Sequence, residues 1–293
     1  MNKYDWLLFL HITGAFLLVG GGVVAAALNM AALRRDRPSE ILVLFGLTRI
    51  AVAAIIAGSL LAFVFGLWLV NEVGYGYGDG WIVGAIVLLI LGNAIGGYAG
   101  SRDARTAKLA EQLVAQGDAP SAELQARVRD PITLVCNYGS GLILVALLAL
   151  IRPDSWNLPL FVHVLGAMIL FGGTATVAIV GFAGRTRSEH AELLARVSLK
   201  TFLFLVIPGW IAMRIGAGWI ADKEFPKDTP GWVDVGFIVS EPGALLLIAL
   251  GILAWVSARR HGVGRAAVAV PVLAGIYVVA LGIAWWAMSA KPG

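Results

Sequence analysis

The sequence predicts an all-α, polytopic membrane protein with about eight spanning helices, arranged as a parallel tandem repeat of four. Three features predict this fold: an apolar composition, eight apolar stretches of spanning length and an internal repeat. Of the 293 residues, 59% are hydrophobic and 14% are charged, whereas about a quarter of the residues in a soluble domain are charged. The mean hydropathy is +0.84. A soluble globular protein is therefore excluded, and the single Cys136 excludes a disulfide framework.

Eight stretches reach the roughly 20 mostly apolar residues that a spanning helix needs. They cover residues 6–33, 42–71, 81–101, 131–151, 156–184, 197–220, 232–257 and 265–289. Basic residues gather in alternate connections, with Arg34, Arg35 and Arg37 in the first, Arg102, Arg105, Lys108, Arg127 and Arg129 in the third, Arg185, Arg187 and Arg196 in the fifth, and Arg259, Arg260 and Arg265 in the seventh. The positive-inside rule places these connections in the cytoplasm and both termini outside. The formal net charge of +4 then reflects basic loops, and no nucleic-acid partner is expected.

The third connection, residues 102–130, is the only long polar one. Ala107, Leu109, Leu113 and Val114 give part of it an amphipathic helical pattern. We expect it to rest on the inner membrane surface, to bind a redox or other soluble partner, or to form a solvated linker helix.

The internal repeat is the most informative feature of the chain. Residues 8–15, LFLHITGA, align with residues 160–167, LFVHVLGA, and the match continues through paired glycines. After a slippage of one residue, Trp68 aligns with Trp219. The repeat predicts two four-helix units, residues 1–152, which include the segment 102–130, and residues 153–293. Because each unit has an even number of spans, the units share one orientation and are related by an axis along the membrane normal.

The repeat places His11 and His163 at equivalent depths in their helices. Ionisable groups inside a bilayer are costly and usually face the interior of the bundle. Small residues, among them Gly14 and Gly166, share a helical face with each imidazole, which permits close helix packing or leaves room for a flat macrocycle. The two histidines are therefore candidate axial ligands of a haem iron, shared or one in each half. The alternative is that both donate hydrogen bonds between helices.

A resemblance to known proteins begins at the first helix. The residues Tyr4, Trp6, Leu10-His11, Gly14 and Gly20-Gly21 resemble the first helix of the copper-resistance CopD and HemJ group of bacterial membrane proteins. The duplicated arrangement resembles an uncharacterised family of predicted bacterial integral membrane proteins with a domain of unknown function. The first resemblance implies haem b binding at His11, and through the repeat at His163, in a bacterial cytoplasmic membrane. The rest of a HemJ-type active site has no identified counterpart in this sequence, and the five scattered Met residues form no copper-binding cluster.

A second candidate site lies in the sixth and seventh spans. Arg214 and Glu241 each lie within an apolar stretch, and Phe63 stands where the first half aligns with Arg214. An intramembrane ion pair is expected, because an unpaired charge would be expensive there. The alternatives are that Arg214 binds a haem propionate and that Glu241 lies on a substrate or proton path. Pro208 and Pro242 are expected to kink these helices.

Two functions from different classes follow from these residues. The first is a haem b-binding redox or electron-transfer subunit with bis-His ligation by His11 and His163. The second is a cofactor-free transporter, channel or anchor and assembly protein whose polar cavity is lined by Arg214 and Glu241. The sequence contains no nucleotide-binding loop, zinc-protease motif or nucleophile elbow, so it specifies no reaction.

Overall fold

The computed structural model describes residues 2–149, 157–224 and 230–290, and every regular element in these ranges is a helix. Eight helices are long and apolar enough to cross a membrane, which confirms the predicted fold class. The spanning helices are α1 (Lys3–Ala32), α2 (Pro38–Val73), α3 (Gly80–Ala115), α5 (Pro131–Ala149), α6 (Leu158–Thr186), α8 (Ile207–Glu224), α9 (Gly231–Arg259) and α10 (Arg265–Ala290). The shorter elements are α4 (Ala122–Val128), η2 (Ser188–His190), α7 (Ala191–Thr201) and η3 (Phe202–Val206).

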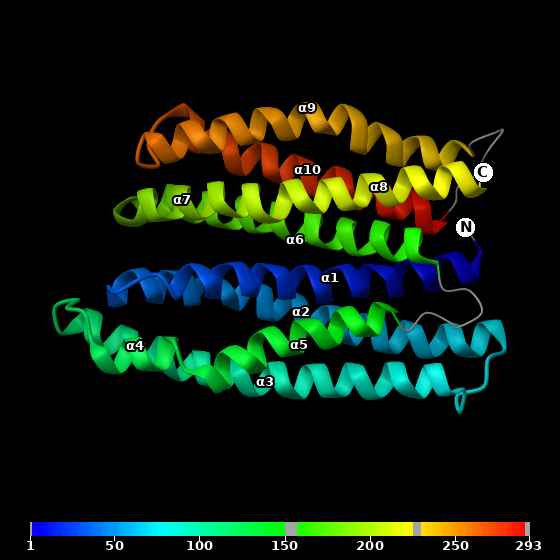
Figure 1. Cartoon of the computed structure of the whole chain (residues 1–293), viewed down its shortest axis with the longest axis horizontal. Coiled ribbons are helices and arrows are strands. Elements are labelled where there is room, and N and C mark those ends of the chain that lie inside the picture. The colour runs from blue at the N-terminus through cyan, green and yellow to red at the C-terminus, as the bar shows by residue number, and fades with distance from the viewer. Residues whose placement is uncertain (1, 150–156, 225–229, 291–293) are drawn as a thin grey trace.

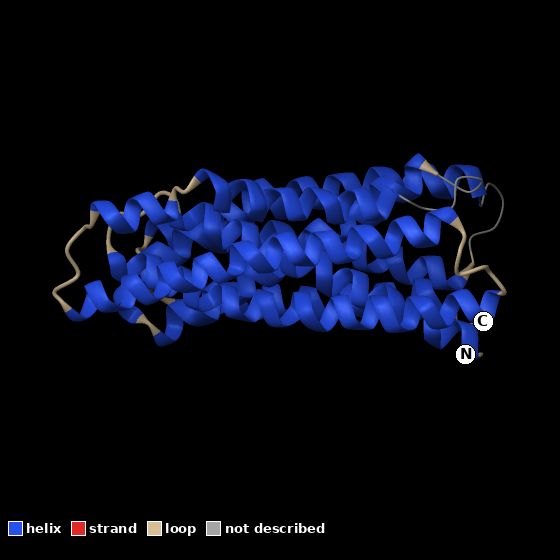
Figure 2. Cartoon of the chain, turned by 90° about the horizontal axis from the view of Figure 1, so that it is seen from below, coloured by secondary structure: helices blue, strands red, loops and turns tan. Residues whose placement is uncertain are grey.

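The helices run side by side along the long axis of the molecule, with α1 and α6 in the middle (Figure 1). Helices α2, α3 and α5 lie on one side of this central pair, and α8, α9 and α10 lie on the other. We call α1–α5 the first half and α6–α10 the second half. The start of α1 and the end of α10 lie at one end of the bundle, the terminal end, as Figure 2 also shows. The arginine-rich connections lie at the opposite end, the basic end.

Glycines set how closely the central helices approach their neighbours. Helix α1 packs on α2, α6 packs on α8, and α1 and α6 pack on each other. A methyl group added to Gly166 of α6 would lie 2.8 Å from the Cα atom of Met213 in α8. One added to Gly172 would lie 2.7 Å from the carbonyl oxygen of Gly20 in α1. Small residues at such interfaces let the backbones of membrane helices meet.

Helix α3 does not end at residue 101, where the predicted span ends, but continues to Ala115. Its 36 residues measure about 54 Å at 1.5 Å per residue, well beyond the roughly 30 Å of a hydrocarbon core. Ala110 of this extension and Leu124 of α4 are fully buried in one cluster with Leu28 of α1 and Leu44 of α2. Three of the four residues of the amphipathic pattern, Ala107, Leu109 and Leu113, pack against this cluster.

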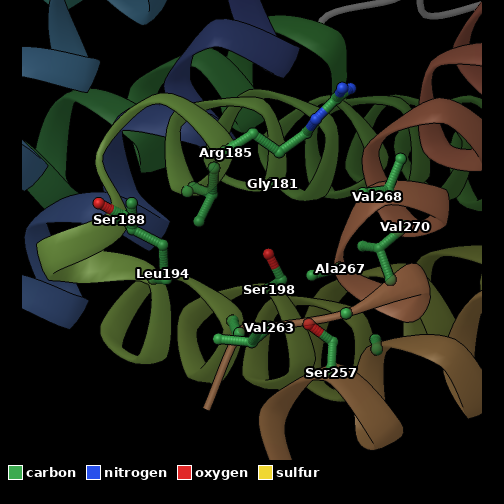
Figure 3. Close-up of a pocket in the computed structure, with 17 residues that line it drawn as sticks. Gly181, Arg185, Ser188, Leu194, Ser198, Ser257, Val263, Ala267, Val268 and Val270 are labelled. Carbon is green, nitrogen blue, oxygen red and sulfur yellow. The ribbon is translucent and has the colours of Figure 1, made fainter. Parts of the chain in front are cut away.

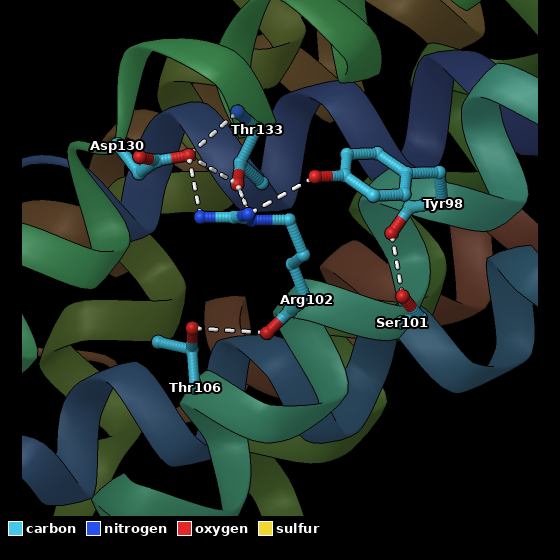
Figure 4. Close-up of polar contacts among 6 residues, drawn as sticks. All are labelled: Tyr98, Ser101, Arg102, Thr106, Asp130 and Thr133. Atoms are coloured by element: carbon cyan, nitrogen blue, oxygen red, sulfur yellow. Dashed lines mark hydrogen bonds and ion pairs between the residues drawn. The ribbon is translucent and has the colours of Figure 1, made fainter.

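Arg102 joins the extended end of α3 to the start of α5 (Figure 4). Its Nε donates to the Thr133 hydroxyl at 2.8 Å, and its Nη2 lies 3.1 Å from the Asp130 carboxylate. Asp130 also accepts a hydrogen bond from the Thr133 backbone N–H at 2.8 Å. A carboxylate that accepts from the first turn satisfies an N–H that the helix itself leaves unpaired. The carboxylate of Asp130 therefore caps the N-terminus of α5 and, through Arg102, connects α5 to α3.

The sixth predicted span begins earlier than expected, because η2, α7, η3 and α8 form one helical rod from Ser188 to Lys223. Its π turn, η3, lies directly before Pro208, which lacks a backbone donor and disrupts the regular hydrogen-bond ladder. Pro242 lies inside α9. The predicted boundary between the repeat units, at residues 152 and 153, lies outside the described residues.

The close contact at Gly166 predicts a measurable loss of stability. Gly166→Ala is expected to lower the free energy of unfolding by about 1–3 kcal/mol, because its methyl group would meet the backbone of α8. The matched control is Gly22→Ala in α1, where an added Cβ has nothing within 4 Å and the higher helix propensity of Ala acts alone. Thermal unfolding of the detergent-purified variants, followed by circular dichroism, should show a lower midpoint for Gly166→Ala only. Equal midpoints for the two variants would contradict this account of the interface.

Candidate functional site

His11 and His163 make the same contact in the two halves. Nδ1 of His11 lies 2.8 Å from the carbonyl oxygen of Ala62 in α2, and Nδ1 of His163 lies 2.9 Å from that of Met213 in α8. A carbonyl oxygen can only accept, so each Nδ1 carries the proton and donates. In the neutral imidazole, Nε2 then keeps an available lone pair. Each histidine therefore holds its helix to the next long helix of its own half.

A glycine one turn along fixes this contact in each half. The backbone of Ala62 lies against Gly14, and the backbone of Met213 lies against Gly166. In each half, the residue whose carbonyl accepts the hydrogen bond from the imidazole is thus the residue whose backbone packs against the glycine. Because a larger residue would push the neighbouring helix away, glycine three positions after each histidine is a condition of the hydrogen bond.

The structure does not aim the two imidazoles at one another. Helices α1 and α6 meet at Gly20 and Gly172, nine residues after His11 and His163 respectively. Nine residues are two and a half helical turns, so each imidazole lies on the face turned away from this contact. Ligation of a haem by both histidines stays a prediction.

A cavity of about 410 Å³ lies beside His163 in the part of the second half nearest the terminal end. Its walls come from α1, α6, α8, α9 and α10. Its lining residues are Leu8, Ile12, Phe16, Leu160, His163, Val164, Ala167, Met213, Ala217, Ile220, Ala221, Trp232, Val233, Gly236, Phe237, Val239, Ser240, Tyr277, Leu281, Ala284, Trp285, Met288 and Ser289. His11 does not line this cavity but packs against Gly66 of α2.

The cavity is mostly apolar, with a few polar groups at defined places. The hydroxyl of Ser240 donates to the carbonyl of Phe237, and that of Ser289 donates to the carbonyl of Trp285, so both are satisfied within their own helices. Tyr277 is 1% exposed, and no described residue is a hydrogen-bond partner of its hydroxyl. A buried hydroxyl without a partner costs about 1–3 kcal/mol. Tyr277 therefore offers an unused donor on the wall of the cavity.

Aromatic rings form the wall of the cavity that faces the first half. The ring of Trp285 lies 4.7 Å from that of Phe16 and 5.2 Å from that of Phe171, measured between centroids. These rings come from α10, α1 and α6, so the cavity is closed by side chains of both halves. Offset and edge-to-face contacts at these distances stabilise such a wall beyond the burial of its area.

Arg214 and Glu241 form an ion pair outside this cavity. Nη2 of Arg214 lies 2.5 Å from Oε1 of Glu241, and the guanidinium lies 5.2 Å above the ring of Phe237. The two side chains are 30% and 55% exposed, so the pair lies on the outer surface of α8 and α9. Neither residue lines the cavity, and its lining residues include no Lys, Arg, Asp or Glu. Among the described residues, no group of three or more His, Cys, Asp or Glu could hold a metal ion.

Several polar contacts within the membrane region were not specified by the sequence. At the basic end of the first half, Oδ2 of Asp103 accepts from the amides of Asn137 at 3.0 Å and Asn29 at 3.3 Å. Nδ1 of His261 lies 2.8 Å from Glu192, so this histidine is not simply solvated. Tyr277, in the last span, was also missed. A tyrosine within an apolar helix was the available signal, but the sequence does not say which neighbour its hydroxyl meets.

Comparison with known proteins gives one result. Residues 5–153 match the model of a family described as predicted integral membrane protein (DUF2269). No curated protein and no solved structure matches the chain. The predicted likeness to an uncharacterised membrane family is confirmed, whereas the likeness to the CopD and HemJ group stays a prediction.

Proposed function

This chain belongs to the family of predicted integral membrane proteins DUF2269, and from that premise we propose that it binds and transports a small, neutral, lipid-soluble solute in the cavity beside His163. The unpartnered hydroxyl of Tyr277 carries this proposal. Nearly all buried polar groups have a partner, and each exception asks for an explanation. A ligand that accepts a hydrogen bond from Tyr277 supplies one.

The walls of the cavity define the chemistry of the solute. The volume of about 410 Å³ falls within the roughly 300–1,000 Å³ of small-molecule sites. Trp232, Phe237 and Trp285 favour an aromatic ring. Because the described residues that line the cavity include no Lys, Arg, Asp or Glu, a charged ligand would be buried without a counter-ion at high cost. The solute is therefore a neutral ring compound.

Two groups of the cavity wall can bind the polar end of the solute. The Tyr277 hydroxyl donates, and Nε2 of His163 accepts, because its Nδ1 proton is held by Met213. Tyr277 lies against Gly243 in α9 and His163 lies against Gly216 in α8, at different depths in the bundle, so a phenol or quinol hydroxyl binds one of these groups and not both at once. Ser240 and Ser289 already donate to their own helices and keep lone pairs for further contacts.

Haem b binding at His163 is a second candidate function. It is favoured by the bond from Nδ1 to a backbone carbonyl, the arrangement that metal-ligating histidines usually show. His163 would hold the iron through Nε2, and the haem would supply one-electron redox chemistry. Arg214, which the sequence suggested for a propionate, is engaged by Glu241. This candidate therefore lacks the basic partner that a propionate group requires.

We further propose that the two halves arose by duplication and share one orientation. The matching bonds of His11 and His163 support this, as does the family match to residues 5–153, which nearly coincides with the first predicted unit. The test is to compare residues 153–293 of related proteins with the family model. Consistent failure to match would contradict a duplication.

Ligand binding is expected to depend on Tyr277 and His163. In thermal-shift titrations of detergent-purified protein, para-butylphenol should bind more tightly than para-butyltoluene, which has a methyl group in place of the hydroxyl. Tyr277→Phe should weaken the affinity for the phenol about tenfold, the effect of roughly one hydrogen bond, and His163→Ala should weaken it because the imidazole is part of the cavity wall. His11→Ala is the matched control, because His11 makes the same backbone contact but does not line the cavity. Equal affinity for both compounds, or an equal loss in His11→Ala, would contradict the proposal.

The haem candidate predicts a visible spectrum. Protein expressed with ample haem and reduced with dithionite should show a Soret band and sharp α and β bands. His163→Ala should abolish these bands, and His11→Ala should retain them, since only His163 lines the cavity. Loss in both variants would instead support the bis-His ligation that the sequence predicts. A featureless spectrum would eliminate haem and leave the solute site.

The basic end is proposed to face the cytoplasm of a bacterial inner membrane, with both termini outside. Single cysteines at Tyr77→Cys and Arg37→Cys, in a Cys136→Ser background, test this orientation. A membrane-impermeant maleimide added to intact cells should label Tyr77→Cys, which lies on the exposed connection between α2 and α3. Arg37→Cys, between α1 and α2, should be labelled only after permeabilisation. The opposite pattern would reverse the proposed topology.

A further inference from the structure

A second cavity lies at the basic end of the second half, between α6, α7, α9 and α10 (Figure 3). Its volume is about 300 Å³, and most of its walls are Gly, Ala, Val and Leu. Figure 3 shows the hydroxyls of Ser198 and Ser257 directed into this space. Ser198 is 2% exposed, and its hydroxyl has no hydrogen-bond partner among the described residues. As with Tyr277, a buried hydroxyl belongs to a residue that lines a cavity, and no described residue accepts a hydrogen bond from it.

Two basic side chains lie near the mouth of this cavity, and the guanidinium of Arg185 extends away from Ser198 and Ser257 (Figure 3). Arg185 is one of its lining residues and is exposed at the end of α6. Arg265 lies at the start of α10 and lines the adjoining groove described below. Glu192 at the start of α7 is paired with Arg196 and His261, so its charge is already compensated. The mouth therefore favours an anion.

An apolar groove continues from this cavity along α10. Gly264 and Val268 line both spaces. The groove then follows Ala269, Val272 and Leu273, which lie on one face of α10 at helical spacing. Its volume is about 650 Å³, and Arg265 lies at its basic end. The two spaces together are polar and cationic at the basic end and apolar along the helix.

We propose that these spaces bind an anionic phospholipid from the leaflet at the basic end. The phosphate accepts hydrogen bonds from Ser198 and Ser257 and pairs with Arg185, and one acyl chain lies in the groove along α10. Hydrogen bonds to a phosphate are charge-assisted and about twice as strong as neutral ones. The phosphate thereby supplies the acceptor that Ser198 lacks. This site is separate from the solute cavity, and its lining shares no residue with that cavity.

Native mass spectrometry of the detergent-purified full chain tests this site. Dioleoyl phosphatidylglycerol should bind about tenfold more tightly than dioleoyl phosphatidylcholine, because the latter carries no net charge. Ser198→Ala and Arg185→Gln should each weaken the binding of phosphatidylglycerol about tenfold. The matched control is Arg259→Gln. Arg259 is another arginine at this end, lies 4.3 Å above the ring of Trp255 and lines neither space.

Three further measurements separate the sources of a bound phosphate and guard against misfolding. Ala269→Phe fills the groove, so it should weaken phosphatidylglycerol but leave glycerol phosphate unaffected. Glycerol phosphate that binds as tightly as the lipid would overturn a lipid ligand in favour of a soluble phosphate ester. Without lipid, Ser198→Ala should unfold no earlier than wild type, because it removes an unpartnered hydroxyl. Equal affinity for both lipids, or equal losses in Arg259→Gln and Arg185→Gln, would overturn the site and indicate only a general attraction to anionic membranes.

Discussion

The close approach of helix backbones at glycine is the constraint on which the rest of this bundle depends. At Gly14 the backbone of Ala62 comes near enough for its carbonyl to accept from His11, and at Gly166 the backbone of Met213 does the same for His163. A hydrophobic effect does not hold helices together in lipid, so packing and interhelical hydrogen bonds must do so. In each half, one glycine therefore provides the packing contact and positions the polar contact one turn away.

The second half departs from the first in how its remaining helices pack. Helix α10 packs on α9 and about equally on α6, and also on α1, whereas α5 packs on α3 and makes only sparse contact with α1 and α6. The solute cavity is formed where α10 spans the two halves, with Trp285 against Phe16 and Phe171. The bond between imidazole and carbonyl is thus common to both halves, but of the two histidines only His163 lines the solute cavity. His163 therefore combines the interhelical hydrogen bond that both halves share with the proposed binding of the solute.

The sequence predicted the spans well because each apolar stretch carries its own signal, independent of its neighbours. It also predicted that His11 and His163 lie at one depth. The sequence did not predict in which direction the imidazoles point, because that depends on which neighbouring helix packs against the face of small residues on each histidine's helix. The face with Gly14 and Gly166 meets the next long helix of its own half, where the closest packing occurs. The helical pattern in segment 102–130 was predicted, but not that this helix continues α3 without a break and buries its apolar face against α1, α2 and α4.

An unpartnered hydroxyl is informative here only together with a cavity. Thr13 and Tyr138 also bury hydroxyls without partners, but neither lines one of the cavities described above. Tyr277 and Ser198 do, at opposite ends of the second half. At either position, Phe or Ala would avoid a cost of about 1–3 kcal/mol with little change in shape. A hydroxyl kept where it costs stability, on a residue that lines a cavity, is best explained by a ligand that completes its hydrogen bond. On that argument the second half holds two ligands of different chemistry, a neutral ring compound near the terminal end and a phosphate near the basic end.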